Sequence, residues 1–297
     1  MFFSALKASV RRLGSIEERC KKIQEALGRI EGRQLRDLPV ADIRESEFRV
    51  FSQGGEDGIF QHLLRHIAVP RKVFIEFGVE SYTESNTRFL LTNNNWAGLV
   101  IDGSSKNVDY IKKDDIYWRF NLKAENAFIS RENINDLIRR NGIEGEIGLL
   151  SIDIDGNDYW VWEAIDVVVP SIVVVEYNAR FGPERAVTVP YDAGFVRTIA
   201  HHSNIYYGAS LAALCLLGKR KGYTFVGCNT GGNNAFFVRN ELRPSSLPEL
   251  TPTEGFVKAQ FRESRDATGA LAYLTEAQEA VILNQSTLVE VSRETEL

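Results

Sequence analysis

The 297-residue sequence contains only three cysteines and four histidines, and this scarcity excludes several structural frameworks. Cys20, Cys215 and Cys228 are odd in number, far apart and outside any CxxC spacing. A disulfide framework needs paired cysteines, and a zinc site needs closely spaced Cys or His ligands. The pattern therefore predicts reduced thiols in a cytoplasmic protein, without structural zinc.

Long apolar runs and a surplus of positive charge are also absent. No run of about 18 apolar residues occurs, so we expect no transmembrane helix. The net charge is −5, with 40 acidic and 35 basic residues. The chain therefore lacks the surplus of positive charge that would predict binding to nucleic acid. Hydrophobic residues make up 44% and charged residues 25%, as in an ordinary globular protein with a sizeable core.

Residues 1–35 predict a helical arm with a coiled-coil pattern. Apolar residues recur at alternating spacings of three and four, which is the seam of a short coiled coil. The seam consists of Leu13, Ile16, Cys20, Ile23, Leu27 and Ile30. Gly14, Gly28 and Gly32 weaken the helix. Two interpretations remain open, namely an arm that joins copies into a homo-oligomer and a helix packed on its own domain.

The first 13 residues carry a second, separate pattern. Phe2, Phe3, Leu6, Val10 and Leu13 could share one helical face, flanked by basic side chains. A basic amphipathic helix of this kind is typical of contact with a membrane surface. We therefore note membrane-surface contact through the N-terminus as one prediction for the arm.

After a polar linker over residues 36–50, the main domain is predicted over 51–240. Apolar runs at 73–78, 98–103, 116–121, 147–153 and 171–178 predict strands. Helix-like segments separate them at 84–95, 105–113, 124–140 and 158–165. This alternation predicts an α/β domain with a doubly wound, mostly parallel, Rossmann-like sheet.

The end of the domain and the tail predict other elements. Residues 223–228 and 235–240 flank the loop NTGGNN, which predicts a C-terminal antiparallel hairpin closing the sheet. Residues 241–297 form an extension that we expect to pack on the domain. Within it we predict helices over 256–266 and 275–284, and a last strand or extended arm over 286–291.

Ligands of open parallel sheets bind outside the carboxyl ends of the strands, so the residues ending each strand are the site candidates. The first predicted strand ends with Glu76 and Gly78, and the second with Asp102, Gly103 and Ser104. A glycine in the first turn and an acid at the second strand tip are features of a nucleoside-binding unit. The turn GVESYTESN lacks the GxGxxG pattern, which argues against a dinucleotide diphosphate.

Four segments carry a resemblance to a known family. FIEFGVESYTESNTRFLL and GLVIDGS look like the first two strands of a class I S-adenosylmethionine-dependent methyltransferase. FSQGGEDGIF and LLSIDIDGND resemble the lead-in and fourth-strand motifs of FkbM-type methyltransferases. The resemblance spans about residues 51–240. It implies an S-adenosyl-L-methionine cofactor and O-methylation of a sugar, a polysaccharide or a glycosylated metabolite.

The resemblance also implies roles for individual residues. Glu76 and Gly78 match the motif around the methionine part of the cofactor, and Asp102, with Gly103 and Ser104, matches the ribose-binding acid. Asn121, as the end of the predicted third strand, matches the adenine-side loop. Further cofactor contacts are implied for Asp153, near the transferred methyl group, and for Asn86, in the glycine-poor first loop.

The acidic run after the predicted fourth strand allows several readings. A calcium loop is rejected, because counted from Asp153 the glycine falls at the fourth position and the twelfth residue is Ala164. Asp153 and Asp155 would share one face of an extended strand, and Glu176 and Asn178 repeat this spacing on the next strand. We expect these four side chains to meet, as a site for Mg²⁺ or another divalent cation.

The alternative is a metal-free reaction in which Asp155 or His202 is the general base that takes the proton of the acceptor hydroxyl. Asp158 is interpreted as a cap of the following helix. We expect the acceptor to be a small molecule or a glycan. Two other functions stay open, a nucleotide-sugar or nicotinamide-dependent Rossmann enzyme and a degenerate methyltransferase fold acting as an oligomeric scaffold.

Overall fold

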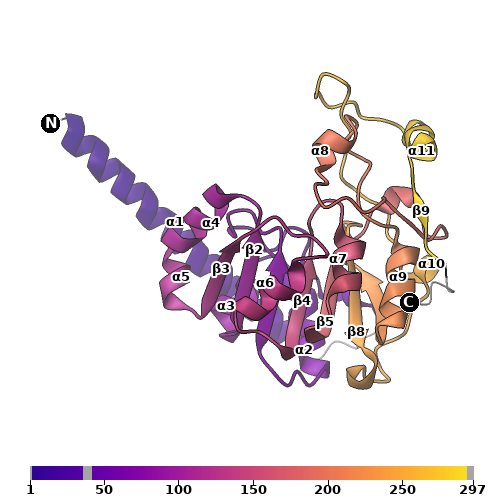
Figure 1. Cartoon of the computed structure of the whole chain (residues 1–297). Helices are drawn as coiled ribbons and strands as arrows, with labels where there is room; N and C mark the ends of the chain where they lie inside the picture. Colours follow the sequence, from indigo (N-terminus) through magenta and orange to yellow (C-terminus); the bar gives the residue numbers. More distant parts are fainter. Residues whose placement is uncertain (1, 36–41, 293–297) are drawn as a thin grey trace.

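A computed structural model describes residues 2–35 and 42–292 (Figure 1). Residues 1, 36–41 and 293–297 lie outside the described residues, as do the side chains of residues 2–11, 13 and 17. The predicted membrane-surface face of the first 13 residues falls on these side chains. Among the described residues, no helix is both long and apolar enough to cross a membrane.

A seven-stranded sheet forms the centre of the molecule, in the order β3-β2-β1-β4-β5-β8-β7. Its strands are β1 (Val73–Phe77), β2 (Ala97–Asp102), β3 (Leu122–Asn126), β4 (Gly145–Ile152), β5 (Val168–Glu176), β7 (Tyr223–Cys228) and β8 (Asn234–Arg239). The first five pair in parallel, and β8 runs antiparallel to both β5 and β7. The predicted doubly wound, Rossmann-like sheet with its antiparallel hairpin is confirmed.

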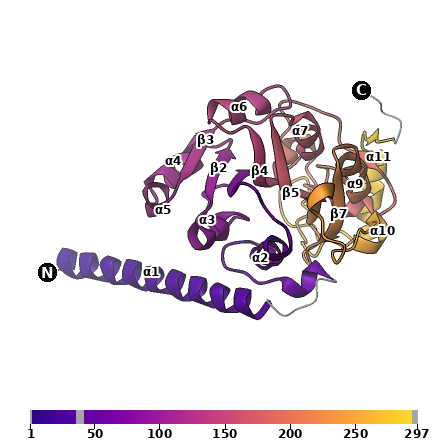
Figure 2. The same ribbon diagram turned by 90° about the horizontal axis from the view of Figure 1, so that it is seen from below.

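Helices cover both faces of this sheet, as a sheet of buried parallel strands requires (Figure 2). On one face lie α2 (Glu56–His66), α3 (Arg88–Asn94) and α4 (Ser105–Lys113). On the other lie α6 (Ile134–Arg140), α7 (Asp158–Ala164) and α9 (Leu211–Arg220). Two apolar cores result, one on each face of the sheet.

The third strand was predicted in the wrong place. Residues 116–119 belong to the helix α5 (Asp115–Arg119), which the side chain of Asp114 caps by accepting the Ile116 N–H at 3.1 Å. The apolar run 116–121 was mistaken for a buried strand. Trp118 within it is 72% exposed, so the run does not form a buried strand face. The strand β3 begins at Leu122, and the carbonyl of Asn121 accepts the N–H of Gly98 at the start of β2. Asn121 therefore lies at the amino edge of the sheet, and its predicted adenine-side role is wrong.

Smaller elements complete the chain. They are η2 (Ile43–Ser46), η3 (Ala179–Phe181), β6 (Val187–Thr188), α8 (Arg197–Ala200), η4 (Asn240–Leu242), α10 (Pro252–Gly255), α11 (Glu276–Gln285) and β9 (Val289–Glu290). The helix predicted over 256–266 is wrong, because this segment is irregular, whereas α11 confirms the helix predicted over 275–284. The strand β9 pairs with β6, and buried Arg180 holds the tail through Glu263 and Glu279, at 2.9 and 3.1 Å.

The predicted N-terminal helix is confirmed as α1 (Phe2–Gln34), which extends beyond the body of the molecule (Figures 1 and 2). Its C-terminal half contacts α2 and α3. The contact is close at Gly28, where an added Cβ would lie 2.3 Å from Val50 and 3.0 Å from Phe89. The helix thus packs on its own domain through one face.

Candidate functional site

The sheet reverses its winding between β1 and β4. From β1 the chain moves outward through β2 and β3, and then returns to place β4 on the other side of β1. A cavity of about 910 Å³ lies where these strands end. Crevices at such reversals are the usual ligand sites of open α/β sheets, and the volume suits a ligand the size of a nucleoside derivative together with a second small molecule.

The exit of β1 is shaped by Gly78, which lines the cavity. Its φ of 70° lies in the left-handed region, and a Cβ at this position would be 1.7 Å from the carbonyl oxygen of Asp153. Only glycine allows β1 and β4 to end so close together. Gly78 therefore brings the first loop against the start of the acidic run.

Glu76 organises the first loop from inside the cavity. One carboxylate oxygen accepts the Asn86 N–H at 2.8 Å, and the other accepts the Thr87 N–H at 3.1 Å. Burial raises the pKa of Glu76 to about 7. The Asn86 side chain lines the cavity and donates to Ser151 on β4. The first loop is therefore held in place by side chains. In the dinucleotide-binding pattern, glycines shape the corresponding loop.

Asp102 stands at the tip of β2, with 7% of its surface exposed, and lines the cavity beside Gly103. It accepts the N–H groups of Glu80 and Ser104, each at 2.8 Å, and so ties the first loop to the start of α4. The Asn107 side chain donates to it as well, at 3.1 Å. A carboxylate has about four acceptor positions, so Asp102 can still accept one hydrogen bond from a ligand hydroxyl. Ser104 caps α4 by accepting from Asn107, and it is not among the cavity-lining residues.

The lead-in FSQGGEDGIF builds the support behind the cavity. Asp57 is buried and accepts the N–H groups of Val50, Phe51 and Ser52, at 2.7–2.8 Å. This turn places Gln53 in the cavity wall. Asp57 therefore holds the backbone of this motif, Glu56 accepts from the side chains of Asn229 and Asn234, and Gln53 lines the cavity.

The loop that follows β3 contributes an aromatic side chain that sequence reasoning missed. Phe128 is 52% exposed, lines the cavity, and lies beside Gly103, whose added Cβ would be 3.5 Å from its ring. The misplaced third strand hid it, since the strand ends at Asn126 and not at Asn121. An exposed ring next to Asp102 is able to stack on a planar base.

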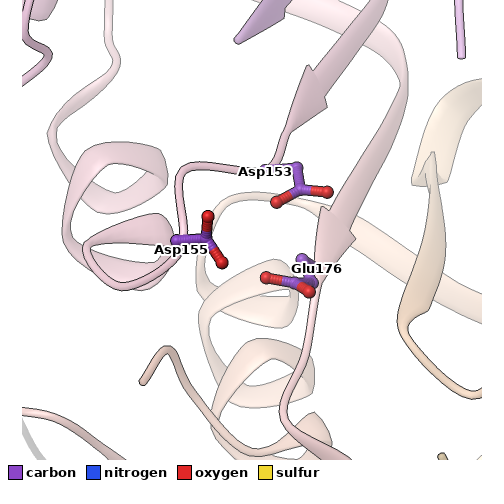
Figure 3. Close-up of side chains that lie close together, drawn as sticks. All are labelled: Asp153, Asp155 and Glu176. Atoms are coloured by element: carbon purple, nitrogen blue, oxygen red, sulfur yellow. The ribbon is translucent and has the colours of Figure 1, made fainter. Parts of the chain in front are cut away.

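Three carboxylates converge at the other end of the cavity (Figure 3). Asp153 and Asp155 follow β4, and Glu176 is the last residue of β5. One oxygen of each lies within 4.8 Å of the other two. The extended geometry predicted for Asp155 is wrong, because its φ is 58°, but the resulting turn still directs its side chain toward the other two.

The charges of this cluster are not fully compensated. Burial first, and then the neighbouring aspartates, raise the pKa of Asp153 well above its ordinary value. Burial and the charge of Asp153 do the same to the pKa of Glu176. The Oε2 atom of Glu176 is buried without a hydrogen-bond partner. Such carboxyls either retain protons or require a cation.

Two further residues predicted for the site, Asn178 and His202, do not serve it. The amide of Asn178 is buried, donates to the carbonyls of Ile205 and Tyr207 and accepts from Arg180, so it is not available as a metal ligand. His202 is exposed and does not line the cavity, so its predicted role as a base is wrong in this structure.

Asp158 was interpreted as a helix cap, but Asn157 precedes the helix, and Asp158 is its first residue. The Asp158 carboxylate accepts the N–H groups of Ile154 and Gly156, at 2.8 and 2.9 Å. It therefore fixes the turn that presents Asp155.

Arg197, which sequence reasoning also missed, brings a positive charge to the cluster. Its guanidinium donates to Asp155 at 2.7 Å, pairs with Glu263 at 2.5 Å, and lies 3.6 Å from the ring centre of Tyr207. All four residues line the cavity. No local motif marks this arginine, because the fold brings it next to a strand tip 42 residues earlier in the chain.

No protein-family model and no curated protein matches the sequence. Among solved structures, the chain is similar to the N-terminal domain of EvdMO1 with SAH bound (11% identity, TM-score 0.40, 73% of this chain and 94% of that one). It is also similar to a SAM-dependent methyltransferase from Aquifex aeolicus (9%, 0.36, 62% and 88%) and to PKMT2 from Rickettsia typhi (9%, 0.40, 61% and 52%). With TM-scores below 0.5, these similarities assign no function to this chain.

Proposed function

We propose that the protein is an S-adenosylmethionine-dependent O-methyltransferase. The observation that carries the proposal is the continuity of one cavity, which joins a nucleoside-type end at Gly78, Asp102 and Phe128 to a carboxylate cluster at Asp153, Asp155 and Glu176. A cofactor and an acceptor could therefore meet at the boundary between these ends.

The first end suits a nucleoside that carries positive charge. Asp102 offers its remaining acceptor position to a ribose hydroxyl, and Phe128 offers a ring to the base. Ten residues separate β1 from α3, so no helix N-terminus stands directly at the strand tip to receive a diphosphate. This loop favours a sulfonium nucleoside over the nicotinamide or nucleotide-sugar alternatives.

The second end suits activation of a hydroxyl. Asp153, Asp155 and Glu176 supply hard oxygen ligands, and the partnerless Oε2 of Glu176 calls for a cation. Ligands on opposite sides of a Mg²⁺ ion are roughly 4 Å apart, so small side-chain adjustments would let the three residues hold one. The ion, when bound, would polarise the acceptor oxygen.

Proton removal falls to Asp155, the exposed member of the cluster. The cofactor, when bound, supplies an electrophilic methyl group on sulfur. Asp155 accepts the proton that the acceptor hydroxyl loses as its oxygen gains that methyl group. Arg197 holds the Asp155 carboxylate in place through the 2.7 Å hydrogen bond, and Asp158 fixes the turn behind it.

The acceptor is proposed to be a hydroxyl of a sugar or of a glycosylated metabolite. Aromatic and polar side chains from distant segments, including Phe195, Phe261 and Arg262, also line this cavity. Rings together with hydrogen-bonding groups suit a ligand with both apolar faces and hydroxyls.

Calorimetry with S-adenosylhomocysteine, with and without Mg²⁺, tests the proposal. We expect Asp102→Ala to weaken binding at least about tenfold, since a charge-assisted hydrogen bond is worth about 1.5–3 kcal/mol. Asp155→Asn should retain this binding and lose Mg²⁺ binding. His202→Ala, outside the cavity, is the control and should change neither.

Thermal unfolding of each variant shows whether the fold is intact. Failure of the wild-type protein to bind S-adenosylhomocysteine would overturn the proposal and favour the scaffold alternative. Binding that is independent of Mg²⁺, together with loss of methyl transfer in Asp155→Asn, would leave Asp155 as base without a metal.

A further inference from the structure

We infer that α1 is a dimerisation helix that pairs, parallel and in register, with α1 of a second copy of this chain. The inference concerns a surface remote from the cavity and is independent of the proposed activity. It rests on three features of the helix: its exposed apolar seam, the opposite face that anchors it to the domain, and the charges beside the seam.

The apolar seam of α1 is not covered by its own domain. Ile16, Ile23, Leu27 and Ile30 are 48–60% exposed, and Cys20 is exposed as well. In heptad notation, Cys20 and Leu27 are at position a, and the three isoleucines are at position d. Four large apolar side chains aligned on one exposed stripe are typical of a protein–protein contact.

The face opposite the seam binds the domain. Gly28, at position b, is buried against Val50 and Phe89, and Gly32, at position f, is buried beside Phe48. All three glycines of the helix, including Gly14, therefore lie off the seam. Because α1 docks on the domain through the face that carries Gly28 and Gly32, its apolar seam points away from the domain. The seam is therefore accessible to a second helix.

The charges flanking the seam select one orientation. Position g carries arginine three times, at 12, 19 and 33. At position e, among the described side chains, Glu31 is acidic, and Gln24 donates a hydrogen bond to the Val50 carbonyl of the domain. In a parallel pair each g position faces an e position of the other helix, so no arginine opposes an arginine. In an antiparallel pair g faces g and e faces e, which sets like charges against each other. The partner that covers the seam is therefore α1 of a second copy of this chain, in parallel orientation.

A parallel pair in register also places the two Cys20 residues side by side in the seam. Disulfide formation needs Cα atoms within about 7 Å, which facing a positions satisfy. In an antiparallel pair centred on the same seam, Cys20 would oppose Ile23, and Ile16 would oppose Leu27. Cross-linking through the seam therefore reports both association and orientation.

Sedimentation of the full chain tests the association. A seam this short predicts a dimer that dissociates on dilution below about 100 µM. Ile23→Lys should raise the dissociation constant about tenfold or more. Ser15→Lys, which adds the same charge at the exposed c position, is the matched control and should leave it unchanged. A chain that stays monomeric at 100 µM, or a dimer indifferent to Ile23→Lys, would overturn the inference.

Oxidation under non-reducing conditions tests the orientation. The wild-type chain should form a covalent dimer, and Cys20→Ser should not, because Cys228 is buried and Cys215 only partly exposed. In the Cys20→Ser background, Ile16→Cys should restore the cross-link. Dimers that sediment together without either cross-link would refute the parallel register.

Discussion

Phe128 shows how one side chain can define one end of a site. It follows β3, keeps its ring half exposed in the cavity, and stands next to Gly103 at the tip of β2. Large apolar side chains are usually buried in the core, so the exposure of Phe128 needs an explanation. An exposed ring beside Asp102 is explained if a planar base covers it when ligand binds.

We expect Phe128→Ala to weaken binding of S-adenosylhomocysteine by about 1–3 kcal/mol, the usual value of stacking a base on an aromatic ring. Trp118→Ala, which removes an exposed aromatic outside the cavity, should leave binding unchanged. Calorimetry on both variants makes the comparison. Equal binding by Phe128→Ala and wild type would remove Phe128 from the cofactor site.

Residues at strand tips could be predicted from the sequence, whereas residues brought in by long-range packing could not. Gly78, Asp102 and Asp153 follow apolar runs directly, so a strand assignment also assigns their place. Arg197 reaches the same cavity from a segment whose position depends on tertiary contacts. His202 illustrates the opposite error, since it belongs to that same segment and points elsewhere.

At the scale of elements, α1 has two contrasting faces, one docked on the domain and one exposed. Its glycines allow close approach to Val50 and Phe89, and its heptad seam remains outside. Gly28 and Gly14 occupy the same heptad position but differ in surroundings, since no atom lies within 4 Å of a Cβ built at Gly14. A substitution at Gly14 therefore tests only the helix propensity of α1, whereas one at Gly28 also tests how α1 docks on the domain.

Gly14→Ala and Gly28→Ala should have opposite effects on stability. Alanine stabilises a helix interior by about 1 kcal/mol over glycine, so Gly14→Ala should be neutral or stabilising. At Gly28 the added Cβ would lie 2.3 Å from Val50, so the docked helix must shift, at a cost of about 1–3 kcal/mol. Chemical denaturation measures both. Stabilisation by Gly28→Ala would mean that α1 does not dock as described.

Elements with several agreeing local signals were predicted well. The helix α4 has the predicted bounds because Ser104 caps it and its apolar residues face one side. The segment 256–266 has helical composition but is held extended by the domain, for instance through the Gln260 N–H to the Gly231 carbonyl at 3.1 Å. Tertiary contacts overrode its local preference.

For the whole molecule, the parallel strands gather acidic side chains at one edge of the sheet. Glu76, Asp153 and Glu176 come from three different strand ends. Loss of water contact raises the pKa of all three, and neighbouring carboxylates raise it further for Asp153 and Glu176. The stability of the chain should therefore depend on whether this edge is protonated or holds a cation. Such a dependence is a property of the fold and not of a single residue.

We expect the metal-free protein to lose stability as the pH rises from about 4.5, the ordinary pKa of a glutamate, to about 7. A carboxyl with a pKa raised on folding, such as Glu76 at about 7, binds more protons folded than unfolded, so its contribution falls as the pH rises. One pKa unit is worth about 1.4 kcal/mol, or roughly 2–4 °C in Tm for a chain of this size.

Mg²⁺ should restore Tm more at pH 8 than at pH 6.5, because the ionised cluster binds it better. Glu176→Gln should keep part of the pH dependence, through Glu76, and lose the Mg²⁺ effect. A wild-type Tm that rises from about pH 4.5 to about pH 7 in EDTA would show that these carboxyls are already ionised in the folded chain.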